Sequence, residues 1–134
     1  MRIIGIDPGL LHTGYGIIDA HGNTLKYVAD GVINAPPKDE MPARLFFIFE
    51  KLQEIIETFS PECAAIEQTF VNDNAQTSLK LGQARGAAIT ALASCSLSVA
   101  EYSANLIKKS TTGVGHSDKN QISAMMKILL GGVT

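Results

Sequence analysis

The chain opens with short apolar runs that are separated by turn signals. Residues 2–7 (RIIGID) are almost continuously apolar, which is typical of a strand buried on both faces. Residues 13–19 predict a second strand, and the Gly22-Asn23 pair that follows is a hairpin signal. Residues 24–34 alternate loosely between apolar and polar positions and predict a third strand. Three strands joined by short turns indicate an antiparallel meander.

The pattern then changes to a helical period. Between Pro42 and Phe59 one apolar stripe recurs at spacings of three and four, and its members are Leu45, Phe49, Leu52, Ile56 and Phe59. Ser60-Pro61 should end this helix. The remaining predicted elements are a short buried strand over 63–67, a helix over 74–93, a strand over 97–102, and two helices over 103–110 and 118–130.

This order of elements predicts an α/β fold with a five-stranded mixed sheet flanked by helices. The sheet should be antiparallel at one side and parallel at the other. At 134 residues and 46% hydrophobic, residues 1–134 can form one domain with a core of its own. No apolar stretch approaches the roughly 20 residues of a membrane span, and no signal peptide precedes the first strand, so we expect a cytoplasmic protein without a membrane partner.

Composition limits the kind of metal site. Cys63 and Cys95 lie in apolar segments without metal-ligand spacing and are expected to be buried, reduced thiols. The three histidines are scattered through turn-rich sequence. Any metal site should therefore be made of carboxylates, which favour hard cations such as Mg²⁺ or Mn²⁺.

Charge is distributed unevenly. Residues 1–75 hold five Lys/Arg against eleven Asp/Glu, whereas residues 76–134 hold six against two. An acidic half beside a basic half would suit a metal-dependent enzyme that acts on a phosphate chain. Ordinary surface charge explains the same distribution equally well.

Two predicted core strands end in a carboxylate, at Asp7 and at Glu67. Ligands of open α/β sheets bind beyond the carboxyl ends of the strands, so the two acids could converge there. Two close carboxylates repel each other unless a cation lies between them. The alternatives are that Asp7 caps the Pro-Gly turn after it and that Glu67 is simply solvated.

Three segments carry a family resemblance. "GIDPGLLHTGYGII", "AIEQTFVNDNAQTSLKLGQARG" and "VGHSDKNQI" occur in this order and resemble the RuvC family of Holliday junction resolvases over essentially the whole chain. The resemblance implies a ribonuclease-H-like fold and a Mg²⁺-dependent endonuclease, with Mn²⁺ able to substitute, that resolves four-way DNA junctions in recombination and repair. It implies that Asp7 and Glu67 are catalytic metal ligands. It also implies a homodimer and a junction branch-migration complex as partners.

The resemblance assigns three DNA-binding positions. Phe70 begins a segment similar to the family loop that enters the junction, where an aromatic ring could stack on an unpaired base. Lys108 and Lys119 match basic positions that contact DNA in the family. Without the resemblance, Phe70 would be a core residue and each lysine a solvated surface residue.

The helix over 74–93 places Leu79, Gly82, Gly86 and Ile89 on one face. Each mid-helix glycine costs about 1 kcal/mol relative to alanine, so close packing should offset that cost. The glycines could let the helix lie tightly on the sheet. The resemblance favours a dimer interface formed by Leu79, Gly82 and Gly86.

Family members continue into a further helix with one or two more acids, whereas this chain ends at "LLGGVT". We therefore expect a C-terminally truncated domain whose own cleavage activity is weak. The alternative is a non-catalytic junction-binding variant. If another acid of this chain serves as a catalytic metal ligand, Glu101 and Asp118 are the first candidates.

A nucleotide-binding protein is a third hypothesis, because "DPGLLHTG" also resembles the phosphate loop of the actin and sugar-kinase group. That group needs a second domain.

Overall fold

The computed structural model describes residues 1–21, 24–68 and 73–102. The elements in chain order are the strands and helices β1 (Arg2–Asp7), β2 (His12–His21), β3 (Thr24–Asn34), α1 (Met41–Phe59), β4 (Cys63–Glu67), α2 (Ala75–Ser94) and β5 (Ser98–Tyr102). The helices predicted over 103–110 and 118–130 lie outside the described residues.

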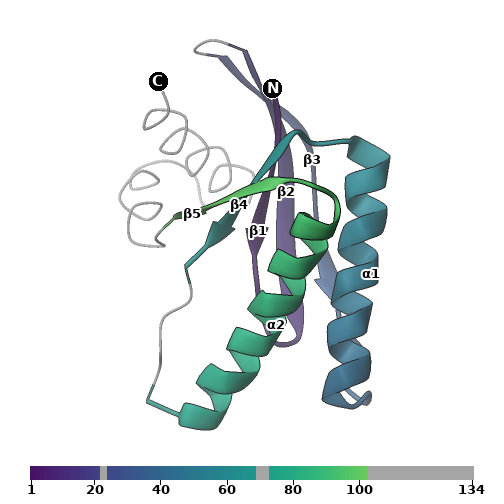
Figure 1. The fold of residues 1–134 in the computed structure, drawn as a ribbon, viewed down its shortest axis with the longest axis vertical. Coiled ribbons are helices and arrows are strands. Elements are labelled where there is room, and N and C mark those ends of the chain that lie inside the picture. Colours follow the sequence, from purple (N-terminus) through teal and green to yellow (C-terminus); the bar gives the residue numbers. More distant parts are fainter. Residues whose placement is uncertain (22–23, 69–72, 103–134) are drawn as a thin grey trace.

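The five strands form a single mixed sheet, as predicted (Figure 1). Their order is β3-β2-β1-β4-β5. The β3, β2 and β1 strands pair antiparallel, and β4 pairs parallel with both β1 and β5. The carboxyl ends of β1 and β4 therefore meet at the same edge of the sheet. This edge is directed toward the end of the molecule at which both helices begin (Figure 1).

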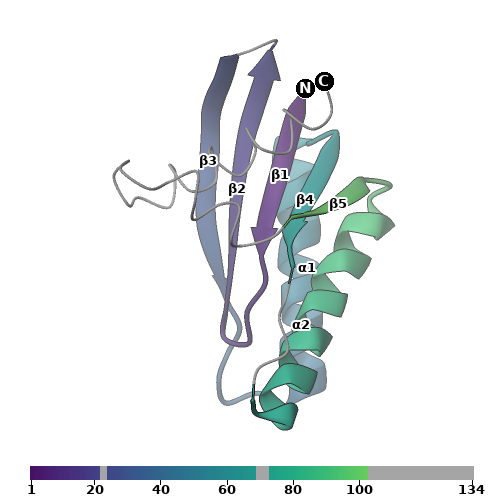
Figure 2. The ribbon, with the colours of Figure 1, turned by 90° about the vertical axis from the view of Figure 1, so that its left-hand side faces the viewer.

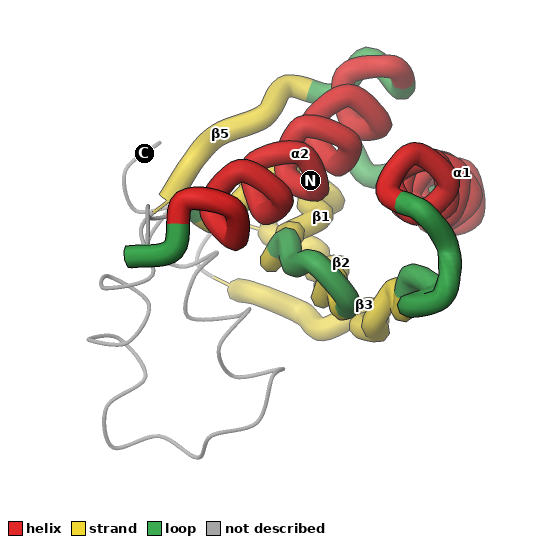
Figure 3. The backbone as a smooth tube through the Cα atoms, turned by 90° about the horizontal axis from the view of Figure 1, so that it is seen from below, coloured by secondary structure: helices red, strands yellow, loops and turns green. Residues whose placement is uncertain are grey.

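Both helices cover the same face of this sheet (Figure 2 and Figure 3). The core lies between the helix layer and the central strands. Its fully buried members include Ile4, Ile6, Ile17 and Ile66 from the strands and Ile48, Leu52, Ala88 and Leu92 from the helices. The alternation of β1 places Ile4 and Ile6 toward the helices, so Ile3, Gly5 and Asp7 face the other way.

Local sequence explains where the helices begin and end. Pro42 lies in the first turn of α1, where its missing N–H costs nothing, and Ser60 ends the helix in a left-handed conformation with φ 51°. The side chain of Asn74 caps α2 by accepting hydrogen bonds from the backbone N–H groups of Gln76 and Thr77, at 3.0 and 3.1 Å.

The buried face of α1 differs from the predicted stripe. Leu52 and Ile56 are buried as expected, but the third buried residue is Ile48, while Leu45, Phe49 and Phe59 are only half-buried. Every residue from 45 to 49 is apolar, so spacing alone did not single out the inward-facing position.

The cysteines were also predicted to be buried. Both are free thiols, but Cys63 and Cys95 are half-buried, and desolvation raises the pKa of the Cys63 thiol.

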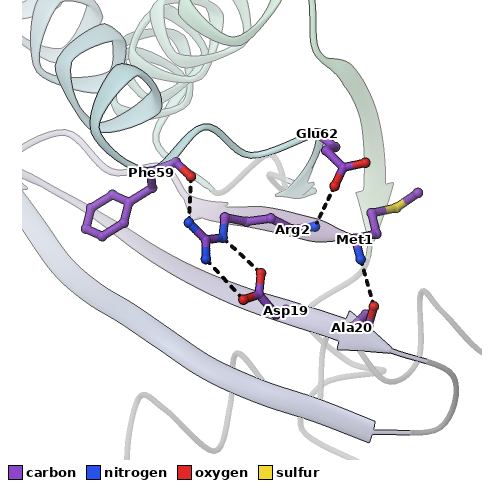
Figure 4. Close-up of polar contacts among 6 residues, drawn as sticks. All are labelled: Met1, Arg2, Asp19, Ala20, Phe59 and Glu62. Atoms are coloured by element: carbon purple, nitrogen blue, oxygen red, sulfur yellow. Dashed lines mark hydrogen bonds and ion pairs between the residues drawn. The ribbon is translucent and has the colours of Figure 1, made fainter.

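The start of β1 is fastened to β2, to the end of α1 and to Glu62, whose carboxylate accepts a hydrogen bond from the backbone N–H of Arg2 at 3.3 Å (Figure 4). The Arg2 guanidinium donates to both carboxylate oxygens of Asp19, at 2.9 and 3.1 Å, and to the backbone carbonyl of Phe59 at 2.8 Å. The amino terminus donates to the carbonyl of Ala20 at 2.8 Å. These contacts hold the end of the sheet that lies opposite Asp7.

No described helix is long and apolar enough to cross a membrane.

Candidate functional site

The carboxylates of Asp7 and Glu67 lie at the ends of adjacent parallel strands. Ile6 of β1 is in register with Ile66 of β4, and each acid is the next residue along its strand. Ile6 and Ile66 both belong to the core under the helices, so Asp7 and Glu67 both point to the opposite face of the sheet. Adjacent strands are about 4.8 Å apart, so the two carboxylates can reach one shared cation.

The surroundings of Asp7 leave room for a ligand. Its side chain is exposed, and its register partner on β2 is Gly14. A Cβ at Gly14 would lie 3.8 Å from the Asp7 Cβ, so the glycine keeps the position beside the carboxylate free of a side chain. Glu67 is half-buried on the other side of Asp7. The acid pair is therefore open toward β2.

The turn that follows Asp7 is held from two sides. Gly9 is required in it, because a Cβ there would come within 2.2 Å of the backbone oxygen of His12. The buried Thr13 side chain faces the backbone of Gly9 at 3.4 to 3.5 Å. Arg44, in the first turns of α1, donates to the carbonyl of Leu10. The turn that follows Asp7 is thus held by contacts from Thr13 and from Arg44.

The donor set fits a hard divalent cation in part. Two carboxylates on one face supply oxygen ligands of the kind that Mg²⁺ and Mn²⁺ prefer. Within residues 1–21, 24–68 and 73–102, no third His, Cys, Asp or Glu completes a cluster with them. Asp7 and Glu67 are therefore two candidate ligands, and the described residues offer no third one beside them.

Glu101 lies on the wrong face to be a further ligand. It is in register with Ile66 on the neighbouring strand β5, and it forms an ion pair with Arg85 of α2. Its carboxylate is therefore on the helix side of the sheet, whereas Asp7 and Glu67 are on the other side. The sequence did not reveal the Arg85–Glu101 pair, and the only signal for it is one arginine in an otherwise small and apolar stretch of helix.

The remaining predicted site residues divide into two groups. Phe70, Lys108 and Lys119 lie outside the described residues. On α2, Leu79 is 66% exposed, and a Cβ at Gly82 or at Gly86 would meet nothing within 4 Å. The glycines therefore do not serve close packing on the sheet, which rules out that alternative. The residues of α2 that pack inward are Ala84, Ala88, Ala91 and Leu92.

Comparison with known proteins agrees with this arrangement. The family model described as "Crossover junction endodeoxyribonuclease RuvC" matches residues 3–132. The RuvC endonuclease of Rhodopseudomonas palustris (strain BisA53) is 51% identical over 130 residues, covering 97% of this chain and 75% of that protein. The RuvC endonuclease of Bradyrhizobium diazoefficiens is 52% identical, covering 97% of this chain and 74% of that protein.

Solved structures give the same result for the fold. T. thermophilus RuvC in complex with a Holliday junction substrate matches with a TM-score of 0.77 and 27% identity, over 98% of this chain and 80% of that one. The yeast mitochondrial Holliday junction resolvase Ydc2 shares the fold alone, with a TM-score of 0.63 at 12% identity, over 97% of this chain and 63% of that one. The sheet is thus the ribonuclease-H-like sheet of the resolvases. On the strength of the family match and these relatives, the chain belongs to the RuvC family of crossover junction endodeoxyribonucleases, which are divalent-metal-dependent nucleases.

Proposed function

We propose that this protein resolves four-way DNA junctions by hydrolysing phosphodiester bonds, and that Asp7 and Glu67 hold the Mg²⁺ ion it needs. The observation that carries the proposal is the register of β1 and β4, which brings both carboxylates to one edge and one face of the sheet. Support for the substrate comes from T. thermophilus RuvC, which was solved in complex with a Holliday junction substrate. The compartment that holds the DNA would then be the cytoplasm.

Each acid has a defined task in this proposal. Asp7, exposed beside Gly14, faces the space that a phosphodiester would occupy, and half-buried Glu67 closes the other side of the site. A bound divalent cation neutralises the two carboxylates and stabilises charge on the phosphate during in-line attack by water. Without the cation, two carboxylates at this spacing would repel both each other and the DNA backbone.

The DNA-binding positions are proposed from the family resemblance. Phe70 follows Glu67 by three residues, close enough in the chain for an aromatic ring to stack on an unpaired base near the cleaved bond. Such stacking contributes about 1 to 3 kcal/mol per base. Lys108 and Lys119 would neutralise phosphates and so add affinity without sequence preference.

We also propose that the protein is a homodimer in which Leu79, Gly82 and Gly86 form the interface. Support comes from the exposed face of α2, where a large apolar side chain lies beside two glycines that have open space above them. A two-fold dimer would present two identical sites to a junction that is itself close to two-fold symmetric. A branch-migration complex that delivers the junction is a further proposed partner.

The proposal is tested by cleavage of a labelled four-way junction in Mg²⁺. The 134-residue chain is compared with a form extended by the C-terminal helix of a family member, and Asp7→Asn and Glu67→Gln are made in both. We expect each substitution to reduce cleavage at least about 100-fold while junction affinity stays nearly unchanged, because a stabilising group at the reacting centre is removed. The control is Glu57→Gln, which removes an exposed carboxylate near the far end of α1.

Three outcomes would count against parts of this proposal. Cleavage by either variant at a tenth of the unaltered rate or faster would remove that acid from the catalytic site. Junction binding without cleavage, even by the extended form, would support a non-catalytic junction-binding protein instead. Equal affinity for a four-way junction and for linear duplex DNA would reject the proposed substrate.

A further inference from the structure

A polar network lies on the helix side of the sheet, directly behind the edge that carries the two acids. Arg85 projects from the middle of α2 and forms an ion pair with Glu101 of β5. The side chain of Arg85 is 20% exposed and that of Glu101 is 48% exposed. Glu101 is the register partner of Ile66, which immediately precedes Glu67. Glu101 therefore lies on the strand next to β4, beside the residue that precedes the proposed metal ligand Glu67.

Gln68 extends this network to the end of β4. It immediately follows Glu67, the last residue of β4, and the alternation of β4 continued by one residue would place it on the same face as Ile66 and Glu101. The Arg85 guanidinium holds the pKa of the Glu101 carboxyl below its usual value, through a hydrogen bond and through its charge, and a hydrogen bond from Gln68 adds to this effect. Glu101 thus joins α2 to the residue that follows Glu67.

We propose that Arg85, Glu101 and Gln68 are positioning residues that fix the end of β4 from the helix side and thereby hold the Glu67 carboxylate toward Asp7. This inference rests on the proposed metal site and adds to it. Glu67 is the last residue of its strand, so the backbone pairing that fixes the rest of β4 ends there. A side-chain tie at the next residue replaces the backbone hydrogen bonds that a longer strand would provide.

The physical basis is preorganisation. A carboxylate that must be held in one orientation for a cation loses affinity when its backbone can move, and groups that orient a metal ligand commonly contribute 10- to 100-fold to metal affinity. Asp7 has an equivalent support, because Arg44 donates to the carbonyl of Leu10 in the turn after it. Arg44 contacts the segment after Asp7 directly, whereas Arg85 acts on the segment after Glu67 through Glu101.

Two substitutions test the network. Gln68→Ala removes only the final link, and because Gln68 is exposed, the melting temperature should not change. Glu101→Gln removes the charge and leaves Arg85, whose Nε is already buried without a described partner, with an uncompensated charge. Glu101→Gln should therefore also reduce stability, so Gln68→Ala is the cleaner variant. The matched control is Gln53→Ala, which removes a 3.1 Å hydrogen bond from a glutamine to Ser94 elsewhere in the helix layer.

Two measurements are made on each variant. In hydrogen exchange without metal, peptides that cover residues 63–68 should exchange about tenfold faster in both network variants and at the unaltered rate in the control. In Mn²⁺ titrations, the dissociation constant should rise at least about threefold for Gln68→Ala and about tenfold for Glu101→Gln. The control should bind Mn²⁺ as the unaltered chain does.

The outcomes separate this inference from the proposed metal site. Unchanged exchange at residues 63–68 in both network variants would overturn the inference, and so would faster exchange with an unchanged Mn²⁺ dissociation constant. Either result leaves the metal site intact, because the unaltered chain still binds. Failure of the unaltered chain to bind Mn²⁺ would reject the metal site and the positioning role together.

Discussion

At the scale of single residues, the chemistry depends on where a strand stops. Asp7 and Glu67 are each the last residue of a strand whose other residues are mostly buried. One more buried position in either strand would move the carboxylate to the helix side of the sheet, because side chains alternate. The sequence showed this directly, since each acid follows an unbroken apolar run. That Asp7 and Glu67 lie near each other followed from the rule that the carboxyl ends of parallel strands meet at the same edge of the sheet.

The Arg2–Asp19 ion pair should make stability depend on pH (Figure 4). The hydrogen bond from Arg2 is the main cause of the lowered pKa of the Asp19 carboxyl in the folded protein. A lowered folded pKa means that the pair stabilises the fold above the unfolded value of about 3.9, and that this contribution is lost as the pH falls through the folded pKa. Asp19→Asn should therefore lower the melting temperature at pH 7, with a difference that shrinks below about pH 4.

Thermal unfolding from pH 2.5 to pH 7 checks this expectation. The control is Asp39→Asn, which removes an exposed carboxylate from the segment before α1. Arg2→Met should lower the melting temperature at pH 7 more than Asp19→Asn does, because Arg2 also donates to the backbone carbonyl of Phe59. A destabilisation by Asp19→Asn that is equal at pH 3 and pH 7 would show that the ion pair is not its cause.

The two proposed DNA-binding lysines should act through charge alone. Lys108→Ala or Lys119→Ala should weaken binding to junctions of every sequence and reduce the slope of log affinity against log salt by about 1 per lost phosphate contact. Affinities measured across a series of salt concentrations give this slope. The control is Lys38→Ala, an exposed lysine in the segment before α1. Unchanged slopes for both variants would place these lysines on an ordinary solvated surface.

At the scale of elements, α2 has two faces with different roles. Its inward face is made of alanines and Leu92, which let the helix pack against α1 and the sheet. Its outward face carries Leu79 and the two glycines. The sequence contained both sets of small residues but did not indicate which one faces the sheet. Small residues at helical spacing suit either kind of close contact. Only the way in which α2 packs against α1 and β5 decides between them.

Gly82→Leu should separate dimerisation from folding. A Cβ at this position meets nothing within 4 Å in the single chain, so leucine fits without strain. Glycine in a helix interior costs about 1 kcal/mol relative to alanine, so the variant should fold with unchanged or greater monomer stability. If Gly82 lies at the dimer interface, the larger side chain will hold the helices apart and yield monomers.

Sedimentation velocity together with thermal unfolding decides this prediction. Lys80→Leu is the matched control, because it also adds an exposed leucine to α2 but on the side of the helix away from Gly82. That variant should remain dimeric. A folded Gly82→Leu protein that sediments as a dimer would remove this face of α2 from the interface.

At the scale of the whole molecule, the sheet was predictable because each strand has a local signal in the sequence. The hairpin signal at Gly22-Asn23, the buried runs and the helix-ending Ser60-Pro61 together specify the order of elements and the mixed sheet. The β2 strand is longer than predicted, from His12 to His21, because pairing with β3 extends it into polar residues. The Arg85–Glu101 contact was not predictable, because it joins residues of two elements whose relative position only the complete fold determines.

We propose above that Asp7 and Glu67 share one divalent cation. Crystals of the protein grown with Mn²⁺, with diffraction recorded at the manganese absorption edge, test it most directly. We expect an anomalous difference peak between the two carboxylates, within about 2.3 Å of an oxygen of each, that is absent from crystals of Asp7→Asn. A peak elsewhere on the sheet, or one that persists in Asp7→Asn, would contradict the claim.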